Sequence, residues 1–387
     1  MKPSIPKGTR DFSPTEVANR TYIINTIKTV FENFGFQPIE TPSFENSSTL
    51  MGKYGEEGDK LLFKILNSGA FVSKVSDELY NEKNSNKLTT KISEKGLRYD
   101  LTVPFARYVV QNRSDITFPF KRYQIQPVWR ADRPQKGRYR EFFQYGVELI
   151  GEAGPLAEAE VIALAIDMLD ACGLENWEIR IGHVGILKGA LTGLGLSADT
   201  PAGANEPPVA SAMRFLDKGD DAGLAQLFTN NGINPEHTAP LRALADLEGG
   251  IETIEPAREI LSSLAGVSLE ALDDLQTTLN AVAALAPAPP SLAVDLTVAR
   301  GLDYYTGMVF EVKVPELGGE GQVLGGGSYK LLHLFGLPDL DPSCGFGLGF
   351  DRVLLALEAQ AEASGRSEVV PGETDPKGLV AFIPFGI

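Results

Sequence analysis

Apolar residues recur at helical spacing shortly after the turn-rich start of the chain. Ser13, Pro14 and Glu16 have the spacing of a helix N-cap, a first helical position and the acidic member of a capping box. Apolar side chains then recur every three or four residues as far as Phe34, and Gly35 ends the pattern. The sequence therefore predicts a helix that begins near residue 14 and ends near residue 34.

The hydrophobic pattern changes several times after this helix. It predicts, in chain order, an extended strand interrupted by proline at 36–44, a polar loop at 73–95, strands over most of 97–150, a helix at 157–172 and a short strand at 178–181. Residues 188–285 have the spacing of several helices, so we interpret them as a mainly helical insert. A stiff proline-rich linker then leads to the last predicted elements, which are strands at 292–298 and 308–314 and a helix at 352–363.

The charge of the chain is unevenly distributed. The net charge is −16, which argues against a general nucleic-acid coat, because neutralising phosphates requires clustered Lys and Arg. Between residues 121 and 140, however, seven basic residues accompany a single acid. A basic patch of this size on an acidic protein favours a small polyphosphate ligand over a long duplex.

Few residues offer disulfide, metal or membrane chemistry. The two cysteines, Cys172 and Cys344, and the three histidines are scattered, so neither a structural disulfide nor a metal site is expected. No apolar run reaches the length of a membrane span, and the first residues do not form a signal peptide. These features predict a soluble protein of the reducing cytoplasm, without contact to a membrane.

Two strands around a basic turn, residues 120–150, are the strongest candidate for a binding site. On the returning strand, Gln144 and Glu148 project from the same face with Gly146 between them. Arginines at 130 and 138 flank the turn, and a guanidinium can bind phosphate oxygens in a bidentate manner. The pattern fits the floor of a ligand site, but a solvated sheet face with surface ion pairs fits it equally well.

Two glycine-containing segments could bring further side chains to such a site. Residues 299–307 place Arg300, an acid and two tyrosines around glycines, in a loop that could reach a pocket. A tight hairpin with buried tyrosines would give the same pattern. Residues 344–352 contain alternating glycines before Arg352, which would clear one strand face for close approach of the backbone. Their spacing matches no Walker or Rossmann motif.

Taken in order, these segments resemble the motifs of class II histidyl-tRNA synthetases. The likeness includes motif 1 up to Pro42, a first histidine signature at 98–108, motif 2 at 130–142, a second histidine signature at 300–307 and motif 3 at 345–352. The two histidine signatures are the more specific part of the likeness, which runs from Gly8 to about Glu358. Residues 145–148 and 325–330 depart from the commoner family pattern.

The resemblance implies an α+β fold, in which a class II synthetase-like antiparallel β-sheet core is flanked by helices and carries a mainly helical insertion. It also implies four segments along the chain: a catalytic core with motifs 1 and 2 at 1–187, a helical insertion domain at 188–290, the catalytic core continued at 291–365, and a linker with the start of an anticodon-binding domain at 366–387. Most of that last domain is expected to be missing.

The activity implied by the resemblance is that of a histidine–tRNA ligase. Such an enzyme activates L-histidine with ATP to histidyl-adenylate and transfers it to tRNA(His). The reaction needs alignment and fixed cations beside two anions and does not need a protein nucleophile. The implied site residues are Arg300 for catalysis, Asp100, Thr102, Gln144, Glu148, Tyr304 and Tyr305 for histidine, and Arg130, Arg138 and Arg352 for ATP. The family uses Mg²⁺ with ATP and forms homodimers through motif 1, so both are expected.

A catalytically inactive relative is the alternative that the sequence leaves open. The regulatory subunit of ATP phosphoribosyltransferase in histidine biosynthesis lacks the anticodon-binding domain, and it often carries a run like Gly146–Gly151. The catalytic subunit of that transferase would then be the partner. The arginines at 130, 138, 300 and 352 favour the enzyme, because an inactive relative has no physical need to hold ATP.

Overall fold

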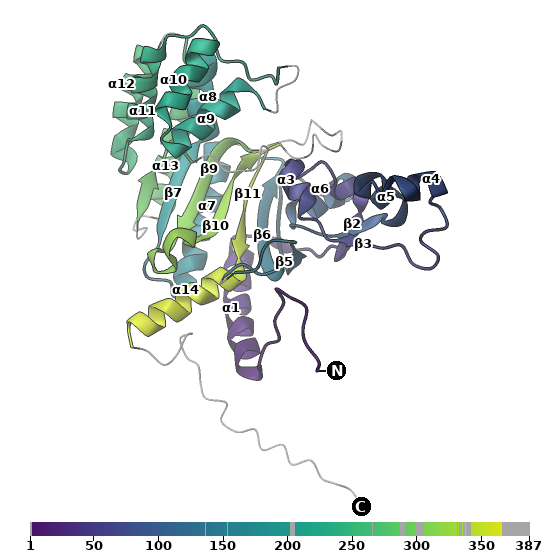
Figure 1. The fold of residues 1–387 in the computed structure, drawn as a ribbon. Helices are drawn as coiled ribbons and strands as arrows, with labels where there is room; N and C mark the ends of the chain where they lie inside the picture. Colours follow the sequence, from purple (N-terminus) through teal and green to yellow (C-terminus); the bar gives the residue numbers. More distant parts are fainter. Residues whose placement is uncertain are drawn as a thin grey trace, which may run out of the picture.

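The centre of the molecule is an eight-stranded sheet. Its strands are β1 (Gln37–Pro38), β5 (Phe120–Trp129), β6 (Glu141–Ile150), β7 (Glu178–His183), β8 (Leu292–Val294), β9 (Tyr305–Lys313), β10 (Gln322–Tyr329) and β11 (Ser343–Gly349). They lie in the order β1-β5-β6-β11-β10-β9-β7-β8 (Figure 1). The central strands pair antiparallel, whereas the edge strands β1 and β8 run parallel to β5 and β7.

This computed structural model describes the chain over most of its length. The described residues are 2–135, 137–152, 154–201, 206–264, 266–286, 291–298, 305–330, 332, 335, 337 and 342–365. The predicted linker at 287–290 and the predicted tail at 366–387 lie outside them. No helix among the described residues is both long and apolar enough to cross a membrane.

Helices α1 (Pro14–Asn33), α7 (Pro155–Ala171) and α13 (Glu270–Leu285) pack together behind the sheet. The predicted start of α1 is confirmed, because the Ser13 side chain caps the helix and the Glu16 side chain returns a bond to the Ser13 backbone. Ile23, Ile27 and Phe31 of α1 are fully buried in the main hydrophobic core. At the far end of the sheet, α14 (Phe350–Ala363) follows β11 and packs on β6 and β10.

A second layer lies beside the strands β5 and β6 (Figure 1). It contains a three-stranded sheet of β2 (Phe44–Asn46), β4 (Lys95–Leu97) and β3 (Lys64–Ile65), with helices α2 (Ser47–Leu50), α3 (Gly55–Lys60), α4 (Asp77–Glu82), α5 (Ser85–Ile92) and α6 (Thr102–Gln111). The prediction of a polar loop at 73–95 is therefore wrong over α4 and α5. The prediction of strands over most of 97–150 is wrong over α6, whose buried face packs into a second core cluster.

The mainly helical insertion stands at one end of the sheet, beyond β7 (Figure 1). Before α13 it contains α8 (Val184–Gly193), α9 (Pro208–Lys218), α10 (Asp221–Asn230), α11 (Thr238–Ala245) and α12 (Ile254–Ser263), with short 3-10 turns at Pro235–His237 and Ile251–Thr253. A further 3-10 segment, Pro315–Glu320, joins β9 to β10. The prediction of an α+β fold with an antiparallel core, flanking helices and a helical insertion is confirmed.

Candidate active site

A cavity of about 660 Å³ lies on the sheet, with β6, β10 and β11 among the elements that line it. Every predicted site residue that the structure describes lines this cavity, namely Asp100, Thr102, Arg130, Arg138, Gln144, Glu148, Tyr305 and Arg352. Arg300 and Tyr304, which were also predicted, lie outside the described residues. Segments that are far apart in the sequence therefore converge on one cavity.

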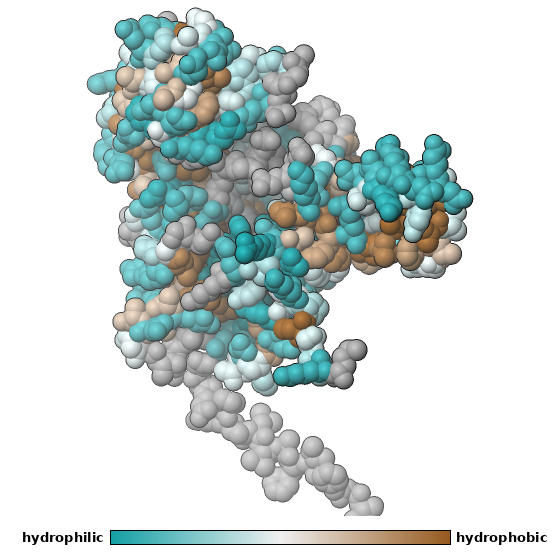
Figure 2. Space-filling model, in the orientation of Figure 1, coloured by the Kyte–Doolittle hydropathy of each residue, from teal (hydrophilic) through white to brown (hydrophobic). Residues whose placement is uncertain are grey.

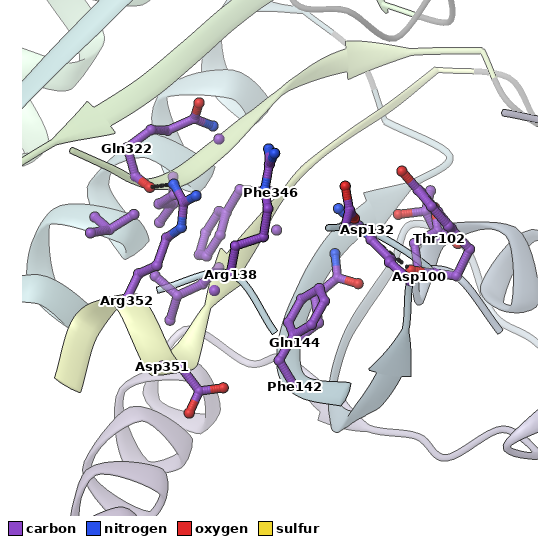
Figure 3. A pocket seen from close by; sticks show the side chains of 18 of the residues that line it. Asp100, Thr102, Asp132, Arg138, Phe142, Gln144, Gln322, Phe346, Asp351 and Arg352 are labelled. Carbon is purple, nitrogen blue, oxygen red and sulfur yellow. Dashed lines mark hydrogen bonds between the residues drawn. The ribbon is translucent and has the colours of Figure 1, made fainter. Parts of the chain in front are cut away.

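The cavity has two chemically different ends. Figure 3 shows Arg138 and Arg352 toward one side and Asp100 and Thr102 toward the other, with Gln144 between them. We call Asp100, Thr102 and Glu148 the carboxylate end, and Arg138 and Arg352 the cationic end. Arg130 also lines the cavity and is close enough to Asp100 to influence the pKa of that carboxyl.

The carboxylate end is built around Glu148, which is only 2% exposed. Its carboxylate forms an ion pair with Arg122, which is fully buried on the neighbouring strand directly opposite. The Thr102 hydroxyl donates a hydrogen bond to Oε1 at 3.0 Å, and the Tyr329 side chain adds another hydrogen bond. Glu148 is thus held in one position from three sides before any ligand is present.

Gly146 makes room for this ion pair. A Cβ atom at position 146 would lie 2.9 Å from Nη1 of Arg122, which donates a hydrogen bond to the Gly146 carbonyl at 3.1 Å. The Arg122 guanidinium also lies over the Phe105 ring, 4.1 Å from its centroid. The glycine between Gln144 and Glu148 therefore leaves space for the Arg122 guanidinium.

Burial and polar contacts act in opposite directions on the pKa of Glu148. Burial raises the pKa of Glu148, while Arg122 and the Thr102 hydroxyl favour the charged form. A carboxylate has about four lone-pair sites, and Arg122, Thr102 and Tyr329 occupy three of them. Within the described residues, these three partners leave one lone-pair site of Glu148 for an N–H group that enters the cavity.

Asp100 is the second buried acid at this end. Its Oδ1 accepts hydrogen bonds from the Tyr54 hydroxyl at 2.8 Å and from the backbone N–H of Val103 at 3.3 Å. Burial raises the pKa of Asp100, and the Tyr54 hydroxyl, Arg130 and the Val103 N–H oppose that rise. Asp100 can therefore accept a hydrogen bond from an ammonium group.

Gln144 joins the two ends of the cavity floor. Within the described residues its buried Oε1 has no hydrogen-bond partner, which is costly unless a ligand supplies one. A Cβ atom at position 347 would lie 2.9 Å from Nε2 of Gln144, so a larger residue there would displace the end of that side chain. At Gly345 an added Cβ atom would lie 2.1 Å from the Val147 carbonyl oxygen, whereas at Gly349 no atom lies closer than 3.7 Å. The expected close approach of the backbone is therefore found at Gly345.

Arg130 and Arg352 each donate a hydrogen bond to a backbone carbonyl. Arg130 donates a hydrogen bond to the Tyr99 carbonyl at 3.0 Å and lies over the Tyr99 ring, 4.2 Å from its centroid. Arg352 donates to the Gln322 carbonyl at 2.6 Å (Figure 3), and Arg138 is exposed. Within the described part of the chain, no acid forms an ion pair with Arg130 or Arg138. Their charge therefore remains available to an anion.

Asp351 also lines the cavity, but its carboxylate forms ion pairs with two arginines from the start of the chain. Arg10 and Arg20 approach Oδ1 of Asp351 at 2.6 Å and 2.7 Å. Arg10 also lies over the ring of Tyr139, 3.5 Å from its centroid. The start of the chain thereby ties α14 to the basic turn and keeps this acid from neutralising the neighbouring arginine.

Reasoning from the sequence missed Arg122, Tyr54 and Tyr329 as parts of the site. Only Arg122 had a usable signal, because it lies on the same face of the predicted hairpin as Gln144 and Glu148. Tyr54 and Tyr329 reach the cavity through tertiary packing, which no local pattern reveals.

Comparisons with known sequences and structures give a consistent result. A family model described as histidyl-tRNA synthetase matches residues 81–353. The histidine–tRNA ligase of Christiangramia forsetii is 46% identical over 388 residues, which cover 100% of this chain and 82% of the relative. The crystal structure of a histidyl-tRNA synthetase from Nostoc sp. PCC 7120 is similar with a TM-score of 0.71 at 25% identity, over 94% of this chain and 76% of that one. A Bacillus halodurans structure titled as an ATP phosphoribosyltransferase regulatory subunit/histidyl-tRNA synthetase also has a TM-score of 0.71, at 26% identity over 92% of this chain and 84% of that one.

Proposed function

Since the chain belongs to the histidyl-tRNA synthetase family, we propose that it is a histidine–tRNA ligase, which activates L-histidine with ATP and transfers it to tRNA(His). The observation that carries this proposal is the meeting of a buried carboxylate end and a cationic end in one cavity. Relatives at 44–46% identity are histidine–tRNA ligases, which favours the enzyme over a regulatory subunit of ATP phosphoribosyltransferase.

In this proposal the carboxylate end binds the amino acid. Asp100, Thr102 and Gln144 receive the α-amino group of histidine, and Glu148 with Tyr304 and Tyr305 binds the imidazole. The lone-pair site left on Glu148 and the unpartnered oxygen of Gln144 support this assignment. Because these polar groups are buried, an amino acid without ring N–H groups would leave them unsatisfied and would be rejected.

The cationic end binds ATP in the same proposal. Arg130 and Arg352 hold the nucleotide, Arg138 meets the outer phosphates, and Arg300 stabilises the charge that develops at the α-phosphate. A carboxylate oxygen of histidine forms a bond to the α-phosphorus while the bond to the leaving pyrophosphate breaks. The terminal ribose hydroxyl of the tRNA then attacks the carbonyl carbon, and AMP leaves. Fixed cations are what the first step requires, because it brings two anions together.

We expect ATP to enter as its Mg²⁺ complex. Among the described residues, no group of three or more His, Cys, Asp or Glu side chains could hold a metal ion. Mg²⁺ commonly reaches an active site through substrate phosphates and keeps several of its waters. The metal ion therefore belongs to the substrate complex, not to a site formed by protein side chains of the described residues.

We also propose that the chain forms a homodimer and acts in the cytoplasm. The large apolar side chains of Phe44, Leu66, Phe71 and Val72 are 37–54% exposed. Figure 2 shows apolar surface on the side of the molecule that carries the three-stranded sheet. Contiguous exposed apolar surface is typical of a protein–protein contact. Light scattering of the purified chain tests this point, and a fully active monomer would contradict it.

Histidine-dependent exchange of pyrophosphate into ATP tests the proposed activity. The assay reports the first step alone, because adenylate formation is reversible. We expect exchange with histidine and Mg²⁺·ATP and background exchange when histidine is omitted. A correctly folded chain without exchange at saturating histidine would overturn the proposal, and its co-purification with a phosphoribosyltransferase would favour the regulatory alternative.

A further inference from the structure

Another buried acid, Glu158, lies behind the sheet on α7 and does not line the cavity. It is 5% exposed, yet its carboxylate accepts several hydrogen bonds from different elements. The Thr278 hydroxyl of α13 donates to Oε2 at 2.8 Å, and the Ser328 hydroxyl of β10 donates to Oε1 at 2.5 Å. The backbone N–H of Met308 on β9 adds another bond. One carboxylate thus joins α7, α13 and two strands of the sheet.

The strands meet Glu158 where their pairing is irregular. Gly327 pairs with Val309, but two residues further along β10, Tyr329 pairs with Tyr305. Three residues of β9 therefore face the single residue Ser328. Such bulges leave backbone groups unpaired and redirect side chains, and they are frequent beside active sites. Glu158 binds the N–H of Met308 and the hydroxyl of Ser328, so it satisfies polar groups on both strands of the bulge.

The far side of the same bulge faces the cavity. Ser328 points toward Glu158, whereas the next residue, Tyr329, lines the cavity and hydrogen-bonds Glu148. Tyr305, the partner of Tyr329 across the bulge, also lines the cavity, and the two rings pack edge to face with centroids 6.4 Å apart. Both phenols therefore project from the two residues that border the bulge.

We propose that Glu158 is a positioning residue for the histidine end of the cavity: from behind the sheet it fixes the β9–β10 bulge and thereby aims Tyr329 and Tyr305. Its bond to Thr278 also ties this bulge to α13, the last helix of the insertion. The inference rests on the proposed function, because it assigns the effect to histidine binding. ATP meets the other end of the cavity, so its binding should be independent of Glu158.

Removing the carboxylate is the first test. Glu158→Ala leaves the Met308 N–H and the hydroxyls of Thr278 and Ser328 without their acceptor, so the bulge can relax. In pyrophosphate–ATP exchange, we expect the KM for histidine to rise about tenfold, as for the loss of a well-placed hydrogen bond, while the KM for ATP changes less than about twofold. Glu158→Gln keeps the shape and one acceptor oxygen, so it should restore much of the histidine KM.

A milder variant and a control separate positioning from general destabilisation. Ser328→Ala removes one donor at the bulge and should raise the histidine KM about threefold, and it carries the test if Glu158→Ala does not fold. Gln360→Ala removes a buried side chain that bonds Glu175 and Gly173 away from the cavity, and it should lower the unfolding temperature without changing either KM.

The outcomes distinguish this inference from the function on which it rests. If the unaltered chain shows no histidine-dependent exchange, the proposed function fails and the role of Glu158 in it fails too. If the unaltered chain is active but Ser328→Ala and folded Glu158 variants keep its histidine KM, only the positioning role is overturned. The positioning role is also overturned if the KM values for histidine and ATP rise together.

Discussion

The two ends of the cavity differ in how their charged groups are bonded within the protein. At the carboxylate end, Glu148 and Asp100 are buried and bonded to Arg122, Thr102 and Tyr54 before a ligand arrives. At the cationic end, Arg138 is exposed, and neighbouring Arg130 is held by an aromatic ring and a carbonyl. The carboxylate end is buried in the folded core, whereas Arg130 and Arg138 form no ion pair with an acid of the described residues and can bind an anionic ligand.

This difference follows from what each end must recognise. A neutral imidazole is selected by a few hydrogen bonds, which discriminate best when the partner groups are rigid and dehydrated. A triphosphate carries its own large charge, so guanidinium groups can bind it from a more open surface. Substitutions should therefore affect both stability and histidine binding at the carboxylate end, but mainly activity at the arginines.

The largest effect is expected from Glu148→Ala. The variant leaves the Arg122 guanidinium buried without its acid, so the free energy of unfolding should fall by about 3–5 kcal/mol. Arg138→Ala at the exposed end should change it by less than about 0.5 kcal/mol. Denaturant titration of both variants gives the comparison. If both unfolded at the same denaturant concentration, the contrast between the ends would be lost.

Arg130→Ala should produce the next largest effect, on rate and with little loss of stability. Removing a fixed donor from a developing anion typically costs about a hundred- to a thousandfold in rate, and we expect that loss in kcat for pyrophosphate–ATP exchange. Histidine affinity, measured by calorimetry, should stay within about threefold of the original. Arg133→Ala is the matched control, because Arg133 belongs to the same turn but does not line the cavity. Equal losses in both variants would point to a general charge effect.

Gly146→Ala should have an intermediate effect, confined to the carboxylate end. The added methyl group would lie 2.9 Å from Arg122 and push it from Glu148, so we expect a loss of about 1–3 kcal/mol and a weaker affinity for histidine. Gly189→Ala is the control, since nothing lies within 4 Å of the added atom on helix α8. That control should be neutral or stabilising. A Gly146→Ala protein as stable as the original would show that Arg122 has room to move.

A smaller effect should appear in the pH dependence of stability. Burial raises the pKa of Asp100 above its usual 3.8, so in the interval above 3.8 the folded chain binds more protons than the unfolded chain. The contribution of Asp100 to the free energy of unfolding then falls as pH rises through this interval. Asp100→Asn should flatten that part of the profile. Tyr54→Phe removes a bond that lowers the pKa and should extend the slope to higher pH; a profile identical in all three proteins would contradict the assignment.

The sequence predicted the central hairpin and most site residues because local alternation is sufficient there. Gln144 and Glu148 share a face in any strand, and the glycines at 146 and 347 indicate crowding nearby. Helix α6 was missed because Val103, Phe105 and Ala106 are buried together, so its apolar run resembles a buried strand. Helices α4 and α5 are short and bury no residue, so their mostly polar sequences were interpreted as a loop.

What the sequence could not supply is the second set of contacts around the site. Tyr54 reaches Asp100 from the turn that precedes α3, and Glu158 reaches Ser328 across the sheet from a separate helix. Both contacts depend on the packing of elements that are 46 and 170 residues apart in the chain. Pairings at such separations are set by tertiary structure, and neither Tyr54 nor Glu158 belongs to one of the recognised motifs.

A crystal structure with a non-hydrolysable analogue of histidyl-adenylate tests the central claim most directly. We predict that its imidazole lies within hydrogen-bonding distance of Glu148, that its amino group contacts Asp100 or Gln144, and that its phosphate mimic lies beside Arg130. An analogue bound in the reverse direction, or bound outside this cavity, would contradict the division of the site into a histidine end and a phosphate end.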